Sequence, residues 1–91
     1  MSYAKNWESI KAGFVLRTED GRYIWEICAE GHPERPTVYY TKYLWEAKSW
    51  KSEQAVFKAE ARIRDQAGRC DVLYFEYDEK QMVRQIKATV T

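Results

Sequence analysis

Residues 14–29 decide the fold, because they place two apolar runs on either side of an Asp-Gly pair: FVLRT (14–18), EDG (19–21) and RYIWEICA (22–29). Glycine at position 21 supplies the positive φ that a tight turn requires. The flanking runs are rich in β-branched and aromatic residues, which favour strands. The stretch therefore predicts a β-hairpin.

The segment after this hairpin predicts a loop, a strand and a bend. Pro33 and Pro36 lack the amide hydrogen that a paired strand needs, so residues 30–36 are expected to form a loop. The run TVYYTK at 37–42 has the composition of a third strand. Residues 43–47 predict a helical turn or bend, so the first three strands should form an antiparallel meander.

One main helix is predicted over residues 53–66. Ser52 is placed to cap its N-terminus, and Gly68 suits the left-handed position that ends a helix. Four apolar residues recur at helical spacing and should lie on the sheet: Val56, Ala59, Ile63 and Ala67.

Two further strands, over residues 70–77 and 82–90, are predicted around the polar turn at 78–81. Tyr3, Trp7 and Ile10 recur at i, i+4 and i+7, which indicates a short amphipathic helix within the first eleven residues. Residues 1–91 are therefore expected to form a single α+β domain. About five antiparallel strands carry the main helix on one face.

Charge and hydropathy exclude several classes of protein. Fifteen basic and fourteen acidic residues give a net charge of +1, too little for a global field that would hold nucleic acid. A mean hydropathy of −0.70, with no apolar run longer than that at residues 72–75, argues against a transmembrane helix and a secretory signal. The expected localisation is cytoplasmic.

Catalytic and metal-binding motifs are not evident in the sequence. There is no GxSxG, P-loop, GxGxxG or HExxH pattern. Cys28 and Cys70 are expected to be reduced, and the single histidine, His32, has no cysteine at zinc-finger spacing. We therefore predict no catalytic residue, metal or cofactor, and a protein that is not an enzyme.

The aromatic residues exceed what one helix can cover. Strict pleating puts Tyr23, Trp25 and Ile27 on one face of the second strand, opposite Ile24 and Cys28. Either the N-terminal segment and the bend near Trp45 close the second face, or that face is a docking surface for a partner.

Phe57 falls on the side of the helix opposite its apolar stripe. Either the bend at 43–50 folds over it, or Phe57 and Arg64 anchor a partner. The predicted partner contacts are thus Trp25, Tyr39, Tyr40, Phe57 and Arg64.

Basic residues concentrate in the segment 48–69, which carries six of them against three acidic residues. This segment is the basis of an alternative function, DNA or RNA binding through the basic helix or through stacking on an aromatic sheet face. The expected contacts are Lys48, Lys51, Lys58 and Arg62. A homodimer built on the uncovered sheet face is a third hypothesis.

Two resemblances bear on function. Three strands followed by SWKSEQA (49–55) resemble, over residues 14–67, the small N-terminal DNA-binding domains of phage-type tyrosine integrases, which implies a three-stranded sheet facing DNA. The sequence departs from that pattern, because residues 14–42 hold four basic and five acidic residues where such strands should be basic.

The pattern TKxLxxAxxW at 41–50 and the aromatic-rich composition resemble small bacteriophage accessory proteins of the anti-CRISPR type. This likeness implies a phage-encoded inhibitor in the host cytoplasm. The leading hypothesis is therefore a non-enzymatic module that docks on a host protein or defence complex through aromatic and arginine anchors.

Overall fold

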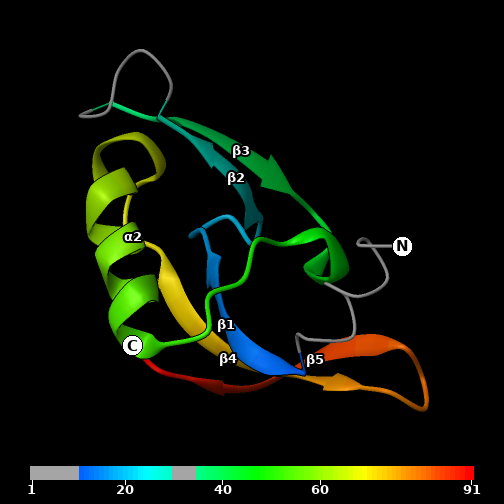
Figure 1. Cartoon of the computed structure of the whole chain (residues 1–91). Coiled ribbons are helices and arrows are strands. Elements are labelled where there is room, and N and C mark those ends of the chain that lie inside the picture. The colour runs from blue at the N-terminus through cyan, green and yellow to red at the C-terminus, as the bar shows by residue number, and fades with distance from the viewer. Residues whose placement is uncertain (1–10, 30–34) are drawn as a thin grey trace.

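The computed structural model describes residues 11–29 and 35–91 and shows one five-stranded antiparallel sheet with one main helix (Figure 1). The strand order is β3-β2-β1-β4-β5. The strands are β1 (Ala12–Arg17), β2 (Tyr23–Cys28), β3 (Thr37–Thr41), β4 (Asp71–Asp78) and β5 (Val83–Thr89). The predicted α+β class is confirmed. The helix expected within the first eleven residues lies outside the described ranges except for its last residue, Lys11, and His32 lies outside them as well.

The helices connect β3 with β4. A 3-10 turn, η1 (Leu44–Glu46), occupies the predicted bend, and α2 (Glu53–Ala67) extends one residue beyond the predicted helix. Ser52 accepts a hydrogen bond from the Ala55 amide at 3.1 Å, and Gly68 ends α2 with φ 73°. Neither helix of the described ranges is long and apolar enough to cross a membrane.

Two core clusters lie on opposite faces of the sheet. The first packs α2 on the sheet through Leu16, Ile24, Val56, Ile63, Cys70 and Val72. The second consists of Val15, Leu73 and Phe75 under Ala47, with Leu44 and Ile86 against it. Neighbouring residues such as Val15 and Leu16 therefore enter different cores. Leu44 and Ala47 of the predicted bend pack on the second face over β1 and β4, whereas the N-terminal segment, which was also expected to cover this face, lies outside the described residues apart from Lys11.

The sheet opens between β1 and β2, and the chain after η1 passes through the opening (Figure 1). β1 pairs with β2 only at Arg17↔Tyr23, beside the predicted Asp-Gly turn. Phe14 instead exchanges two backbone hydrogen bonds with Trp50, at 2.8 and 2.9 Å, and the Lys48 amide donates to the Ile24 carbonyl at 2.9 Å. The segment 47–50 therefore supplies hydrogen bonds that a longer hairpin would have made.

The predicted alternation along β2 is wrong beyond Ile24. The pairing with β3 passes from Ile24↔Tyr40 to Glu26↔Tyr39, so Trp25 has no cross-strand partner and forms a β-bulge. This extra residue reverses the alternation of side chains between the two faces along the rest of β2. Ile24 and Ile27 consequently pack on the same core cluster, instead of on opposite faces.

Candidate functional site

The bulge in β2 exposes Trp25 next to Tyr39 of β3. Their ring centroids lie 6.0 Å apart with the planes at 81°, an edge-to-face arrangement. Trp25 remains 51% exposed and Tyr39 45% exposed. The structure therefore brings two of the predicted partner contacts together on the hairpin formed by β2 and β3.

A second aromatic pair follows β3 directly. Tyr43 and Trp45 stack with their ring centroids 5.6 Å apart, and they are 55% and 57% exposed. The hydroxyl of Thr41 donates to the Glu46 carboxylate at 2.5 Å and accepts from the Tyr43 amide at 3.2 Å. Because Thr41 and Tyr39 are two residues apart in one strand, this ties η1 to the face of β3 that carries Tyr39.

Sequence reasoning missed Tyr43 and Trp45 as candidate contacts. Their positions on either side of Leu44 in the predicted bend could have indicated them. When a tight turn directs Leu44 to the core, the side chains before and after it point to solvent. Leu44 does pack against the second core cluster. The four rings of Trp25, Tyr39, Tyr43 and Trp45 are called the aromatic pairs below.

Tyr40 is placed on the opposite face from Tyr39. It is half-buried against the first core cluster, and the Arg22 guanidinium lies 4.3 Å from its ring centroid. A cation over a ring face is a favourable contact within the protein. The structure therefore separates Tyr40 from the aromatic pairs.

Phe57 and Arg64 line one cleft beside α2, with a volume of about 310 Å³. Phe57 is 36% exposed and lies outside both core clusters. The cleft, called the α2 cleft below, is lined by Phe57, Glu60, Arg64, Arg69, Cys70, Asp71 and Thr91. Two further predicted contacts thus share a concave site, which is distinct from the aromatic pairs.

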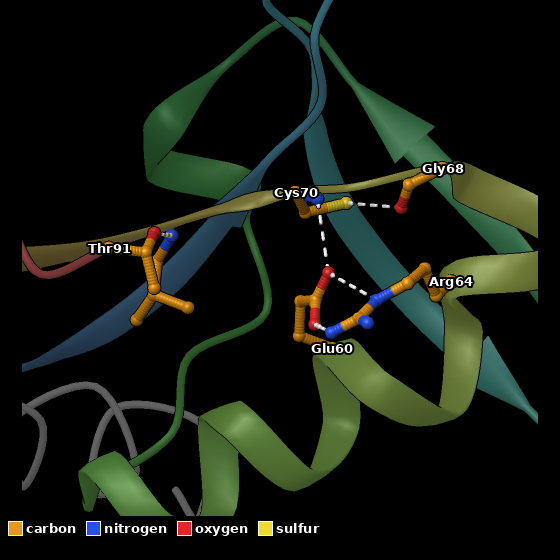
Figure 2. A network of polar contacts seen from close by, with 6 residues as sticks. Glu60, Arg64, Gly68, Cys70 and Thr91 are labelled. Carbon is orange, nitrogen blue, oxygen red and sulfur yellow. Dashed lines mark hydrogen bonds and ion pairs between the residues drawn. The ribbon is translucent and has the colours of Figure 1, made fainter.

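Glu60 organises the wall of this cleft and was not predicted (Figure 2). Only 5% of it is exposed. Its carboxylate accepts hydrogen bonds from Arg64 Nη2 at 2.5 Å, from Arg64 Nε at 3.3 Å and from the Cys70 amide at 3.2 Å. Burial alone raises the pKa of Glu60, but the hydrogen bonds from Arg64 and Cys70 outweigh it and hold the pKa below its usual value.

The Cys70 thiol lies beside this carboxylate. Burial, together with the negative charges of Glu60 and Asp71, raises the pKa of Cys70 to about 11. The thiol is therefore protonated at neutral pH and is a poor nucleophile. Within the described residues, no group of three or more His, Cys, Asp and Glu side chains is arranged to hold a metal ion.

The predicted nucleic-acid contacts lie in three places. Lys48 lies 3.7 Å from the Glu26 carboxylate and 5.8 Å from the Trp50 ring centroid. Lys58 and Arg62 instead line a shallow pocket of about 260 Å³ on α2, together with Trp50. Lys51 is exposed just before the helix.

Fold and surface together define an α+β domain with exposed aromatic pairs on one side and a charged cleft beside its helix. No protein-family model, curated protein or solved structure matches the chain. The resemblances to integrase domains and to anti-CRISPR proteins stay predictions.

Proposed function

We propose that this chain is a non-enzymatic protein-binding domain that docks on its partner through the aromatic pairs. The observation that carries the proposal is the exposure of four large rings on the β2–β3 hairpin and on the turn that follows it. Trp and Tyr are enriched at binding hot spots, because each buries a large area while fixing few rotatable bonds.

The arrangement of these rings favours binding. Each pair holds its rings in contact before a partner arrives, so association costs less side-chain entropy. The bulge at Trp25 and the hydrogen bonds around Thr41 fix the backbone beneath them. A phage-encoded inhibitor of a host protein or defence complex is the narrower form of this proposal.

The test combines affinity capture with binding measurements on the purified partner. Capture from a nuclease-treated lysate of the host cell identifies the partner and removes partners bridged by nucleic acid. Trp25→Ser and Trp45→Ser should each weaken its binding at least about tenfold, which corresponds to about 1.4 kcal/mol. The thermal midpoint should change little, because both rings are already half in water.

Matched controls are available at the opposite edge of the sheet, next to β5. Met82, in the turn before β5, and Val83, the first residue of β5, are 61% and 39% exposed. Met82→Ser and Val83→Ser remove exposed apolar surface that does not belong to the aromatic pairs. Equal losses in the control variants, or unchanged binding in the tryptophan variants, would refute the proposal.

Nucleic-acid binding is the second candidate, because the pocket on α2 combines the Trp50 ring with two basic side chains, Lys58 and Arg62. Aromatic stacking next to cations is typical of single-strand binders. This function requires affinity for single-stranded DNA or RNA that falls steeply with salt. It also requires that neutralising Lys51, Lys58 and Arg62 together abolish the binding.

A further inference from the structure

The α2 cleft presents a guanidinium that is held in place but only partly used. Arg64 donates to Glu60 through Nε and Nη2, and these two contacts fix the plane of the group (Figure 2). Nη1 makes no hydrogen bond with a side chain or backbone atom of the described residues. A donor fixed in this way binds an incoming acceptor with little loss of entropy.

Two basic and two acidic side chains line the cleft, and one of the basic ones has no ion pair within the described ranges. Glu60 is paired with Arg64, and Asp71 lies 3.8 Å from the Arg17 guanidinium. Arg69 also lines the cleft and has no ion pair within the described ranges. Arg69 is therefore the basic residue of this cleft that no acidic side chain of the described ranges pairs.

Apolar surface completes the cleft. The exposed part of Phe57 lies on the wall formed by α2, one helical turn before Glu60. Thr91 lies on the opposite side, where its hydroxyl accepts a hydrogen bond from the Val72 amide at 2.9 Å (Figure 2). A ligand that reaches Arg64 and Arg69 therefore packs its adjoining carbon atoms on the Phe57 ring.

We propose that the α2 cleft binds a monovalent carboxylate carried on a short apolar chain. The carboxylate accepts hydrogen bonds from Arg64 Nη1 and from Arg69, and the chain lies on Phe57. Such a group occurs both in small carboxylic acids and in the glutamate side chains of proteins. This site is separate from the aromatic pairs, so it does not depend on the function proposed above.

The charge balance favours a carboxylate over a phosphate. One negative charge can pair with Arg69, whereas a phosphate dianion would add a second charge close to Glu60 and Asp71. Guanidinium groups bind both anions in bidentate geometry, so geometry alone does not select between them. Selectivity should therefore come from repulsion by the two acidic residues.

The test follows backbone amide signals by NMR while butyrate is added at constant ionic strength. Butyrate should shift the amides of Arg69 and Cys70 and the Nε–H of Arg64 along one saturable curve. Butyramide, which has the same shape without the charge, should shift none of them. Acetate, which lacks the apolar chain, and inorganic phosphate should each bind at least threefold more weakly than butyrate.

Variants locate the binding. Arg69→Gln should weaken butyrate binding at least about tenfold, whereas Arg62→Gln removes the same charge from α2 outside this cleft and should change it less than twofold. Phe57→Ser should remove the advantage of butyrate over acetate. Circular dichroism of each variant checks that the fold is retained.

A blocked Gly-Glu-Gly peptide distinguishes the two sources of the ligand. Tighter binding of the peptide than of butyrate identifies a protein side chain as the ligand, and the reverse identifies a small acid. Shifts that are equal for butyrate and butyramide, that spread over all basic residues, or that persist unchanged in Arg69→Gln would overturn the proposal.

Discussion

Glu60 shows how a single residue can escape sequence analysis. Its charge suggests a solvated position, although it lies four residues after Val56 and three before Ile63, on the helix face that carries the apolar stripe. Its burial depends on the Cys70 amide, which lies ten residues later in the chain and reaches Glu60 only after Gly68 has reversed the chain direction. The sequence carries no local signal for that contact.

Replacing Glu60 with glutamine should lower the free energy of unfolding by about 1–3 kcal/mol at pH 7, because a buried charged acceptor of three hydrogen bonds is lost. Since the pKa of Glu60 is lowered on folding from 4.5, its ionised form stabilises the native state above that value. The contribution is lost as the pH falls through the lower, folded pKa.

Urea unfolding of the wild type and of Glu60→Gln at several pH values measures this effect. The difference between the two proteins should be largest at neutral pH and should shrink as the solution becomes more acidic than pH 4.5. Glu53→Gln, in the exposed first turn of α2, is the matched control. A difference that stays constant with pH would contradict the assigned role.

Cys70 should resist thiol reagents in the folded protein. In a Cys28→Ser variant, labelling by a disulfide reagent at pH 8 should be slow and should accelerate as the pH approaches 11, because the thiolate is the reactive form. The raised pKa also means that Cys70 stabilises the fold below pH 9, its ordinary value, and that this contribution is lost between pH 9 and 11. Rapid labelling at pH 8 without unfolding would show that the thiol is accessible.

At the scale of elements, the helix and the turns were predictable and the pairing of β1 was not. The start and end of α2 follow from Ser52 and Gly68, whose preferences are local. The divergence of β1 from β2 depends on Trp50, which bonds to Phe14 from 36 residues further along the chain. The predicted alternation along β2 was wrong for a related reason, because the bulge at Trp25 depends on how β2 pairs with the neighbouring strand β3.

The candidate site was predictable in part. Exposure of Trp25 and Tyr39 agrees with the aromatic excess recognised in the sequence, and Phe57 and Arg64 do share one cleft. Tyr40 differs from its neighbour Tyr39 because the pleat turns successive side chains to opposite faces. Which of the two tyrosines is buried depends on the face of the sheet on which α2 packs, and this does not follow from the sequence of β3 alone.

Gly13 is the residue that allows segment 47–50 to enter the sheet. A Cβ atom there would lie 2.6 Å from the Trp50 carbonyl oxygen and 3.2 Å from the Phe75 ring. Gly13→Ala should therefore lower the free energy of unfolding by about 1–3 kcal/mol, since neither backbone nor core can move without loss of contacts. Chemical denaturation measures the change.

The neighbouring residue Ala12 provides a control for this substitution. It is exposed in the same strand, so Ala12→Ser should change stability by less than about 0.5 kcal/mol. A Gly13→Ala variant that is as stable as the wild type would mean that β1 and segment 47–50 are further apart than described.

At the scale of the molecule, Arg84 joins parts of the chain that lie far apart in sequence. From β5 it donates to the Ala47 carbonyl at 2.6 Å and to the Leu44 carbonyl at 3.4 Å, and its guanidinium lies 4.9 Å from the Phe75 ring centroid. Burial lowers the pKa of Arg84, which is nevertheless charged. The second core cluster is thereby closed by a residue of the last strand.

Arg84→Met should lower the free energy of unfolding by about 1.5–3 kcal/mol, because two carbonyl groups lose a charged donor. Lys87→Met removes a charge from an exposed position of the same strand and should have little effect. Thermal or chemical unfolding of both variants checks this. If Arg84→Met and Lys87→Met were equally stable, the contacts of Arg84 would not be what closes the second core cluster.

The strand order places β1 in the centre of the sheet, with its full partner late in the chain. Six residue pairs, from Ala12↔Glu76 to Arg17↔Asp71, join β1 to β4, against one pair with β2. During synthesis on the ribosome, β1 therefore waits for β4 to emerge, and protease should digest chains truncated after Gly68 as readily as an unfolded protein. Until then the nascent chain exposes an unsatisfied central strand, which makes chaperone protection most valuable while this protein is still being translated.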